Sequence, residues 1–151
     1  MQPLGYQYLI DLQGCNVERI TDTEFVRGAL LRAASEAGAT IITDVFHQFN
    51  PYGVSGVVII AESHVAIHTW PEHGFASVDF FSCSDAMSGQ ALHLRLSKEF
   101  QAKSSNIQVI KRGVPLRAVE NASENASENG SENGSACGSV APVTYLPVTT
   151  G

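Results

Sequence analysis

The residues best suited to chemistry lie between positions 55 and 83, in the stretch SGVVIIAESHVAIHTWPEHGFASVDFFSC. This stretch places the pair Glu62-Ser63, three histidines and Cys83 among apolar residues. Hydroxyl, imidazole and thiol groups are the side chains that proteins use as nucleophiles and proton carriers. We therefore expect any activity of this chain to depend on this stretch.

One interpretation of the histidines is a zinc site made of His64, His68, His73 and Cys83. His64 and His68 are four residues apart, which places them on one side of either a strand or a helix, and imidazole and thiolate are zinc ligands. The chain has no HExxH motif, and the spacing is not that of a zinc finger. A single histidine is more often structural, and a serine such as Ser63 between two strands is often only a turn former. We rank a zinc-binding module last among the alternatives.

Periodic apolar patterns predict the elements that must position these side chains. Strands are predicted at residues 6–12, 39–49, 56–61, 64–70, 75–81 and 106–110. Helices are predicted at about 21–37, where Thr21 and Glu24 form a capping box, and at about 88–103. The order β-α-β-β-β-β-α-β predicts an α+β layered sandwich, in which an antiparallel sheet carries two helices on one face.

The length of 151 residues suits one domain, followed here by a polar linker and a C-terminal tail that is again partly apolar. Residues 120–135 read ENAS ENAS ENGS ENGS, without large apolar side chains, which predicts a disordered linker. We place the domain at residues 1–119 and a tail of unknown role at 136–151. The Asn-x-Ser sequons of the repeat would matter only on a secretory route, which the N-terminus does not indicate.

Charge and composition exclude several classes of partner. Four of the acidic residues lie in the repeat, so residues 1–119 are nearly neutral and offer no basic stripe for nucleic acid. No apolar run approaches the ~20 residues that a membrane span needs. The three cysteines show no CxxC spacing, which favours a reducing compartment. We expect a cytoplasmic protein that binds neither nucleic acid nor membrane.

The string ESHVAIHTWPEHGFASVDFFSC resembles the signature of the small bacterial and archaeal S-adenosylmethionine decarboxylases. The preceding FNPYGVSGVVII and SEAGATIITDVFHQF also resemble this family, so that the resemblance covers about residues 4–112. It implies a proenzyme that cleaves itself between Glu62 and Ser63 and converts Ser63 into a covalently bound pyruvoyl group. Such a group is needed because decarboxylation requires an electron sink, which no standard side chain supplies.

The resemblance also implies roles for individual residues. His68 would abstract the proton for β-elimination, a task suited to an imidazole whose ordinary pKa lies near neutrality, and Ser55 would assist it. Cys83 would return a proton to the substrate during turnover, since a thiol with a pKa of about 8.5 stays protonated at neutral pH. A buried structural cysteine is the alternative for Cys83.

Substrate recognition is likewise implied by the resemblance. Phe49 would stack on the adenine of S-adenosylmethionine, and Glu72 would accept hydrogen bonds from the ribose hydroxyls. Trp70, beside Glu72, would serve either substrate binding or packing. The resemblance implies a homodimer with shared sites, in which Ser63 and Cys83 come from one protomer and the remaining site residues from the other: Phe49, Ser55, His68 and Glu72.

We therefore predict a pyruvoyl-dependent decarboxylase that converts S-adenosylmethionine to decarboxylated S-adenosylmethionine for spermidine synthesis. The nearest alternative is the same chemistry on arginine or ornithine, since enzymes on this scaffold that have moved to those substrates keep the cleavage residues. A third interpretation is a catalytically silent homologue that regulates an active relative, although such a protein would not need Ser63, His68 and Cys83 together.

Overall fold

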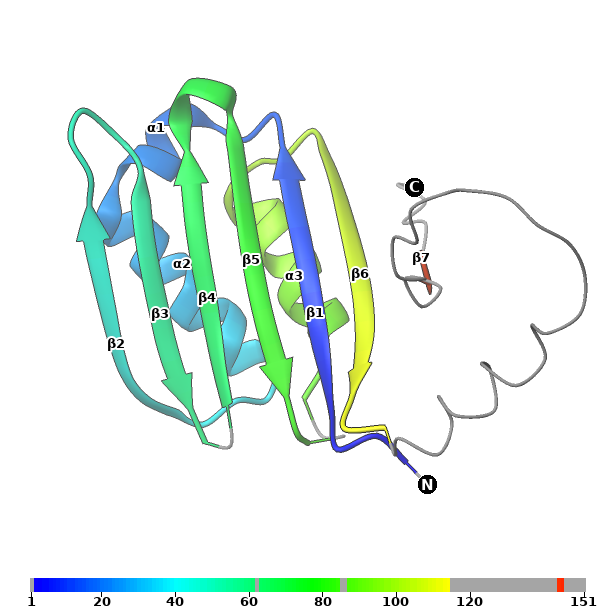
Figure 1. Cartoon of the computed structure of the whole chain (residues 1–151). Helices are drawn as coiled ribbons and strands as arrows, with labels where there is room; N and C mark the ends of the chain where they lie inside the picture. The colour runs from blue at the N-terminus through cyan, green and yellow to red at the C-terminus, as the bar shows by residue number, and fades with distance from the viewer. Residues whose placement is uncertain (1, 62, 85–86, 115–143, 146–151) are drawn as a thin grey trace, which may run out of the picture.

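The computed structural model describes residues 2–61, 63–84, 87–114 and 144–145 (Figure 1). In chain order the elements are β1 (Gly5–Gln13), α1 (Val17–Thr21), α2 (Thr23–Glu36), β2 (Ile41–Gln48), β3 (Val54–Ile60), β4 (Ser63–Trp70), the 3₁₀ helix η1 (Pro71–His73), β5 (Phe75–Ser82), α3 (Gly89–Glu99), β6 (Ser104–Arg112) and β7 (Thr144–Tyr145). The strands form one antiparallel sheet in the order β2-β3-β4-β5-β1-β6-β7. The predicted α+β sandwich is confirmed.

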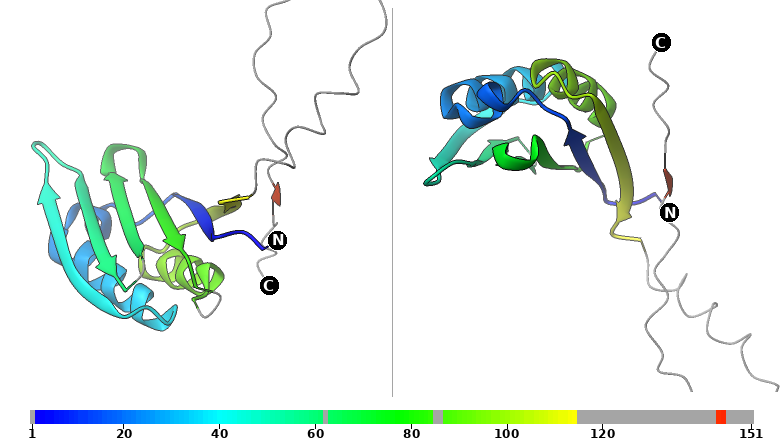
Figure 2. Two further views of the ribbon diagram at one scale, coloured as in Figure 1. Left: turned by 60° about the horizontal axis from the view of Figure 1, so that its bottom comes forward. Right: turned by 90° about the horizontal axis from the view of Figure 1, so that it is seen from above.

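The two faces of the sheet have different surroundings. Helices α2 and α3 cover one face, where alternate strand residues such as Val65, Ile67 and Val78 are buried (Figure 1, Figure 2). The other alternate residues, including His64 and His68, project from the opposite face, because successive side chains of a strand point to opposite sides. We call this second face, which no described helix covers, the open face.

Helix α2 begins two residues later than the sequence pattern predicts. The side chain of Asp22 caps it by accepting hydrogen bonds from the backbone N–H groups of Glu24 and Phe25. Thr21 instead ends the short helix α1, so the predicted Thr21–Glu24 capping box is wrong. An aspartate is as good an N-cap as a threonine, and Asp22 has the extended backbone that a cap requires.

Helix α3 begins as predicted and ends earlier than predicted. Ser88 caps it through the backbone N–H of Ala91. The helix stops at Glu99 rather than near Lys103, because Gln101 adopts a left-handed backbone with φ 52° and turns the chain toward β6. Leu92 and Leu96 are buried against the sheet.

The end of the chain contributes one short pairing to the sheet. Thr144 and Tyr145 form β7, which pairs antiparallel with Val109 and Gln108 of β6. The predicted linker at residues 120–135, and the predicted tail apart from these two residues, lie outside the described part of the chain. The division at residue 119 stays a prediction. None of the helices in the described ranges is long and apolar enough to cross a membrane.

Candidate active site

The predicted site residues divide into two groups at opposite ends of β4. At the upper edge of the sheet in Figure 1, where β4 ends and β3 begins, lies the group that we call the His68 cluster: Phe49, Ser55, His68, Trp70 and Glu72. At the lower edge, where β4 begins and β5 ends, lies the group that we call the Ser63 end: the predicted residues Ser63 and Cys83, with their neighbours His64 and Phe81.

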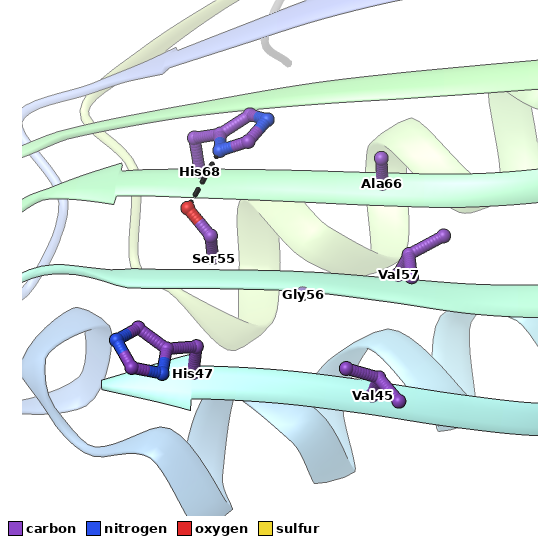
Figure 3. Close-up of a pocket in the computed structure, with 7 residues that line it drawn as sticks. All are labelled: Val45, His47, Ser55, Gly56, Val57, Ala66 and His68. Carbon is purple, nitrogen blue, oxygen red and sulfur yellow. Dashed lines mark hydrogen bonds between the residues drawn. The ribbon is translucent and has the colours of Figure 1, made fainter. Parts of the chain in front are cut away.

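The centre of the His68 cluster is a hydrogen bond between neighbouring strands. Ser55 of β3 and His68 of β4 are register partners on the open face. The Ser55 Oγ lies 2.7 Å from Nδ1 of the His68 ring, so a hydrogen bond joins the two groups (Figure 3). This bond orients the imidazole and leaves Nε2 available as a proton acceptor or donor.

A turn places Phe49 at the edge of this cluster. The backbone N–H of Phe49 donates to the carbonyl of Gly53 across 2.8 Å, which closes the connection between β2 and β3. Gly53 has φ +109°, and a Cβ there would meet the carbonyl oxygen of Thr69 at 3.1 Å. A glycine therefore lets the turn pack closely against the end of β4, and the Phe49 ring remains half exposed there.

Thr69 is a structural residue of the site that the sequence interpretation missed. Its buried hydroxyl accepts a hydrogen bond from the backbone N–H of Val54 and donates one to the carbonyl of Ile20, each across 2.8 Å. One side chain thereby joins β3, β4 and α1 directly behind Ser55 and His68. The only signal in the sequence was a threonine at a position where strand alternation predicts burial.

Two adjacent cavities share Ser55 and His68. The first, of about 330 Å³, is lined by aromatic, polar and acidic groups: Phe49, Tyr52, Gly53, Ser55, His68, Thr69, Trp70 and Glu72. The second, of about 290 Å³, lies on the open face and has a mostly apolar floor, with His47 on its far side (Figure 3). Its lining residues are Val45, His47, Ser55, Gly56, Val57, Ala66 and His68. Aromatic rings with a nearby carboxylate suit a flat heterocycle that carries hydroxyl groups.

Trp70 combines packing with exposure to the first cavity. Its ring lies 5.5 Å from the ring of Phe75 and 6.2 Å from that of His68, measured between centroids. The side chain is nevertheless 39% exposed. Both alternatives for Trp70, packing and binding, are therefore compatible with its position.

The Ser63 end contains a buried hydroxyl without a partner. Ser63 Oγ is inaccessible to solvent. It neither donates nor accepts a hydrogen bond within the described residues. Because His64 pairs with Phe81, Ser63 lies beside Ser82 at the end of β5, and Cys83 follows directly. Cys83 is a free, exposed cysteine rather than a buried one. Glu62, on the other side of the predicted cleavage point, lies outside the described residues.

The two groups do not meet within one protomer. Ser63 and His68 are five residues apart on one strand, which corresponds to roughly 16 Å at about 3.3 Å per residue. They also point to opposite faces, since Ser63 Oγ is buried on the helix side and His68 is exposed on the open face. If Ser63 and His68 act on the same atoms, each end of β4 therefore contributes only half of a complete active site.

The fold does not assemble the zinc site considered above. Within residues 2–61, 63–84, 87–114 and 144–145, no group of three or more histidine, cysteine, aspartate or glutamate side chains is placed to hold a metal ion. His68 instead bonds to Ser55, and Cys83 lies at the other end of the strands.

The fold is an α+β sandwich, and its open sheet face carries a Ser–His pair beside a cavity with aromatic and acidic lining. These are the features expected of the decarboxylase family that the sequence resembles. The sequence model described as S-adenosylmethionine decarboxylase matches residues 6–113. The chain is 47% identical over 114 residues to the S-adenosylmethionine decarboxylase proenzyme of Thermodesulfovibrio yellowstonii, covering 76% of this chain and 84% of that one. It is 46% identical over 111 residues to the protein of the same name from Pseudomonas aeruginosa, covering 74% and 69%.

Solved structures agree with this assignment. The crystal structure of the adenosylmethionine decarboxylase from Aquifex aeolicus VF5 matches with a TM-score of 0.66 at 33% identity, covering 86% of this chain and 100% of that one. A Trypanosoma brucei AdoMetDC structure, with a TM-score of 0.53 at 15% identity over 77% of this chain and 55% of that one, shares the fold. The chain belongs to the S-adenosylmethionine decarboxylase family.

Proposed function

We propose that the chain is a proenzyme that cleaves itself between Glu62 and Ser63 and then decarboxylates S-adenosylmethionine. The product, decarboxylated S-adenosylmethionine, would serve spermidine synthesis. The observation that carries the proposal is the 2.7 Å contact between Ser55 Oγ and His68 Nδ1, beside a cavity lined by Phe49 and Glu72. The names of the relatives, which describe decarboxylase proenzymes, support the same reaction.

The hydroxyl of Ser63, which has no hydrogen-bond partner among the described residues, fits the self-cleavage step. Its oxygen would attack the carbonyl carbon of Glu62, and the peptide bond between them would become an ester. Removal of the Cα proton of residue 63 by His68 would then eliminate the carboxylate of residue 62. Hydrolysis of the resulting dehydroalanine would release ammonia and leave a pyruvoyl group at the start of the chain 63–151. A hydroxyl without a hydrogen bond is free for this attack.

The pyruvoyl group, once formed from Ser63, would supply an electrophilic carbonyl for the substrate amine and thereby the electron sink that decarboxylation requires. Around it, Cys83 would return the proton to the substrate carbon, for which an exposed thiol beside residue 63 is suitably placed. Phe49 would stack on the adenine, and Glu72 would accept from the ribose hydroxyls. Trp70 would close the same cavity from the side of Phe75.

We infer that the complete site forms between two copies of this chain. A two-fold axis lying between two facing open faces, and running across the strands, places the Ser63 end of each copy opposite the His68 cluster of the other. Sheets that pack in this way lie ~10 Å apart, which side chains can span. Val45, 66% exposed, and Ile59, 38% exposed, are apolar residues of the open face that such packing would bury.

An intact-mass spectrum of the freshly purified chain, with and without a carbonyl reagent, tests the proposal. We expect two polypeptides, residues 1–62 and 63–151, of which only the larger reacts with the reagent. A single unmodified chain that still binds the nucleoside would favour the silent regulatory homologue. If cleavage occurs, parallel assays with S-adenosylmethionine, arginine and ornithine separate the substrates, because only the first carries an adenine and a ribose for Phe49 and Glu72.

A further inference from the structure

An arginine at the lower edge of the open face takes no part in the chemistry described so far. We propose that Arg112 binds the α-carboxylate of the amino-acid substrate at the Ser63 end. The inference rests on the proposed function, since it assigns a ligand group to the same composite site. It is carried by a row of three residues across neighbouring strands: Cys83, Gly5 and Arg112.

Strand register creates this row. In β1, Tyr6 pairs with Ser82 of β5 and Gly5 pairs with Arg112 of β6. Cys83 directly follows Ser82, so Cys83 and Arg112 flank Gly5 from its two sides. β5 and β6 both end at the lower edge of the sheet, where β4 begins (Figure 1).

The absence of a side chain at Gly5 brings the flanking groups together. A Cβ at Gly5 would lie 2.8 Å from the ring of Phe81 and 2.9 Å from the carbonyl oxygen of Ser82, both too close. The Phe81 ring therefore extends over Gly5. The guanidinium carbon of Arg112 lies over that ring, 5.8 Å from its centroid. The stacking carries the positive charge from β6 across β1 to β5, where Phe81 is the register partner of His64 in β4.

Arg112 also has no acidic partner within the described part of the chain. Among the described residues, Arg27, Arg32 and Arg95 each form an ion pair with a carboxylate, whereas no such pair involves Arg112. Its guanidinium lies on the face that a second copy would cover in the proposed dimer. A guanidinium that loses water without gaining an anion is costly, so this position calls for a negatively charged group.

The substrate supplies such a group. Its reacting carbon must lie close to residue 63, which is adjacent to Ser82 and Cys83, and the α-carboxylate is attached to that carbon. Guanidinium groups bind carboxylates through two parallel hydrogen bonds. The carboxylate leaves as carbon dioxide, so its negative charge is dispersed in the transition state. The pairing with Arg112 therefore weakens in the transition state, and we expect its loss to raise KM without lowering kcat.

Two substitutions with equal charge loss test this role. Arg112→Ala removes the proposed carboxylate ligand, and the matched control Lys111→Ala removes a neighbouring charge from the opposite side of β6, where Lys111 pairs with Tyr6. Intact mass first establishes that each variant is cleaved. We expect Arg112→Ala to raise KM about 10- to 100-fold with kcat retained, the range for one charged hydrogen-bonding pair. Lys111→Ala should change KM less than about twofold.

The decarboxylated product provides the second readout, because it lacks only the carboxylate. Its inhibition constant should be the same in the wild type and in Arg112→Ala. An unchanged KM in the cleaved variant, or an equal loss of affinity for substrate and product, would overturn the assignment. If Arg112→Ala is not cleaved, Arg112→Gln keeps most of the side chain for the same comparison. Failure of the wild-type chain to cleave or decarboxylate would instead reject the proposed function itself.

Discussion

Ser63 and His68 lie at opposite ends of β4 and project from opposite faces of the sheet. They are five positions apart along the strand, which corresponds to roughly 16 Å. In the proposed dimer, the proton transfer between residue 63 and His68 would take place between two copies of the chain. This relationship makes the two roles separable by mutation, because each half of a composite site can come from a different polypeptide.

Mixed proenzymes should restore cleavage. Neither Ser63→Ala nor His68→Ala should be cleaved efficiently alone, since the first lacks the nucleophile and the second the base. In a co-expressed mixture with different tags, the Ser63 of a His68→Ala chain faces the intact His68 of its partner. About half of the His68→Ala chains should then be cleaved if pairing is random, as measured by intact mass. Absence of any cleavage in purified mixed dimers would show that the site is not shared.

Replacement of Cys83 with alanine should separate cleavage from turnover. Cys83 is exposed and lies past the end of β5, so its loss leaves the core unchanged. We expect normal self-cleavage and a fall in kcat of about 10²- to 10⁴-fold, the usual contribution of a positioned proton donor. Steady-state assays on the cleaved variant measure this effect, and wild-type turnover would refute the role of Cys83.

Thr69→Val should lower the free energy of unfolding. The valine keeps the shape and removes both hydrogen bonds, which leaves the buried N–H of Val54 and the carbonyl of Ile20 unpaired. We expect a loss of about 1–3 kcal/mol, measured by urea denaturation in the uncleaved Ser63→Ala background. Thr40→Val, at an exposed position before β2, is the control. Equal stability of the two variants would contradict the importance assigned to Thr69.

The buried ring of His93 should make stability depend on pH. Burial lowers the pKa of His93 below its ordinary value of 6.5, and neither ring nitrogen has a hydrogen-bond partner among the described residues. Below pH 6.5 the unfolded chain binds a proton that the folded chain does not, so the free energy of unfolding falls until the pH passes the folded pKa. Urea denaturation between pH 7.5 and 5 measures this slope.

His93→Leu should flatten this pH dependence, because the leucine cannot take up a proton in the unfolded state. His73→Gln, which changes an exposed histidine after β4, should leave the slope as in the wild type. If the slope persists in His93→Leu, other groups are responsible for it. Asp44 and Glu99 also have lowered pKa values, but their effect on the free energy of unfolding falls at lower pH, where these carboxylates become protonated.

Local sequence patterns were sufficient for the elements but not for all of their ends. Alternation in β4 and β5 predicts both strands within one residue of their observed limits, because one buried face repeats with the period of a strand. Helix ends depend on single side chains and backbone angles. Asp22 rather than Thr21 caps α2, and the left-handed backbone of Gln101 stops the chain from continuing α3. Neither outcome follows from the apolar pattern.

The sequence by itself determined the family, the antiparallel α+β architecture and the residues of the central stretch, because motif spacing and side-chain alternation are local properties. The tertiary structure decided which of those residues meet. Strand pairing sets Ser55 against His68, at the end of β4 that lies away from Ser63. The insertion of β1 between β5 and β6 brings Arg112 over Phe81, residues 31 positions apart. Such contacts depend on strand order and register, which arise only when the sheet is assembled around its core.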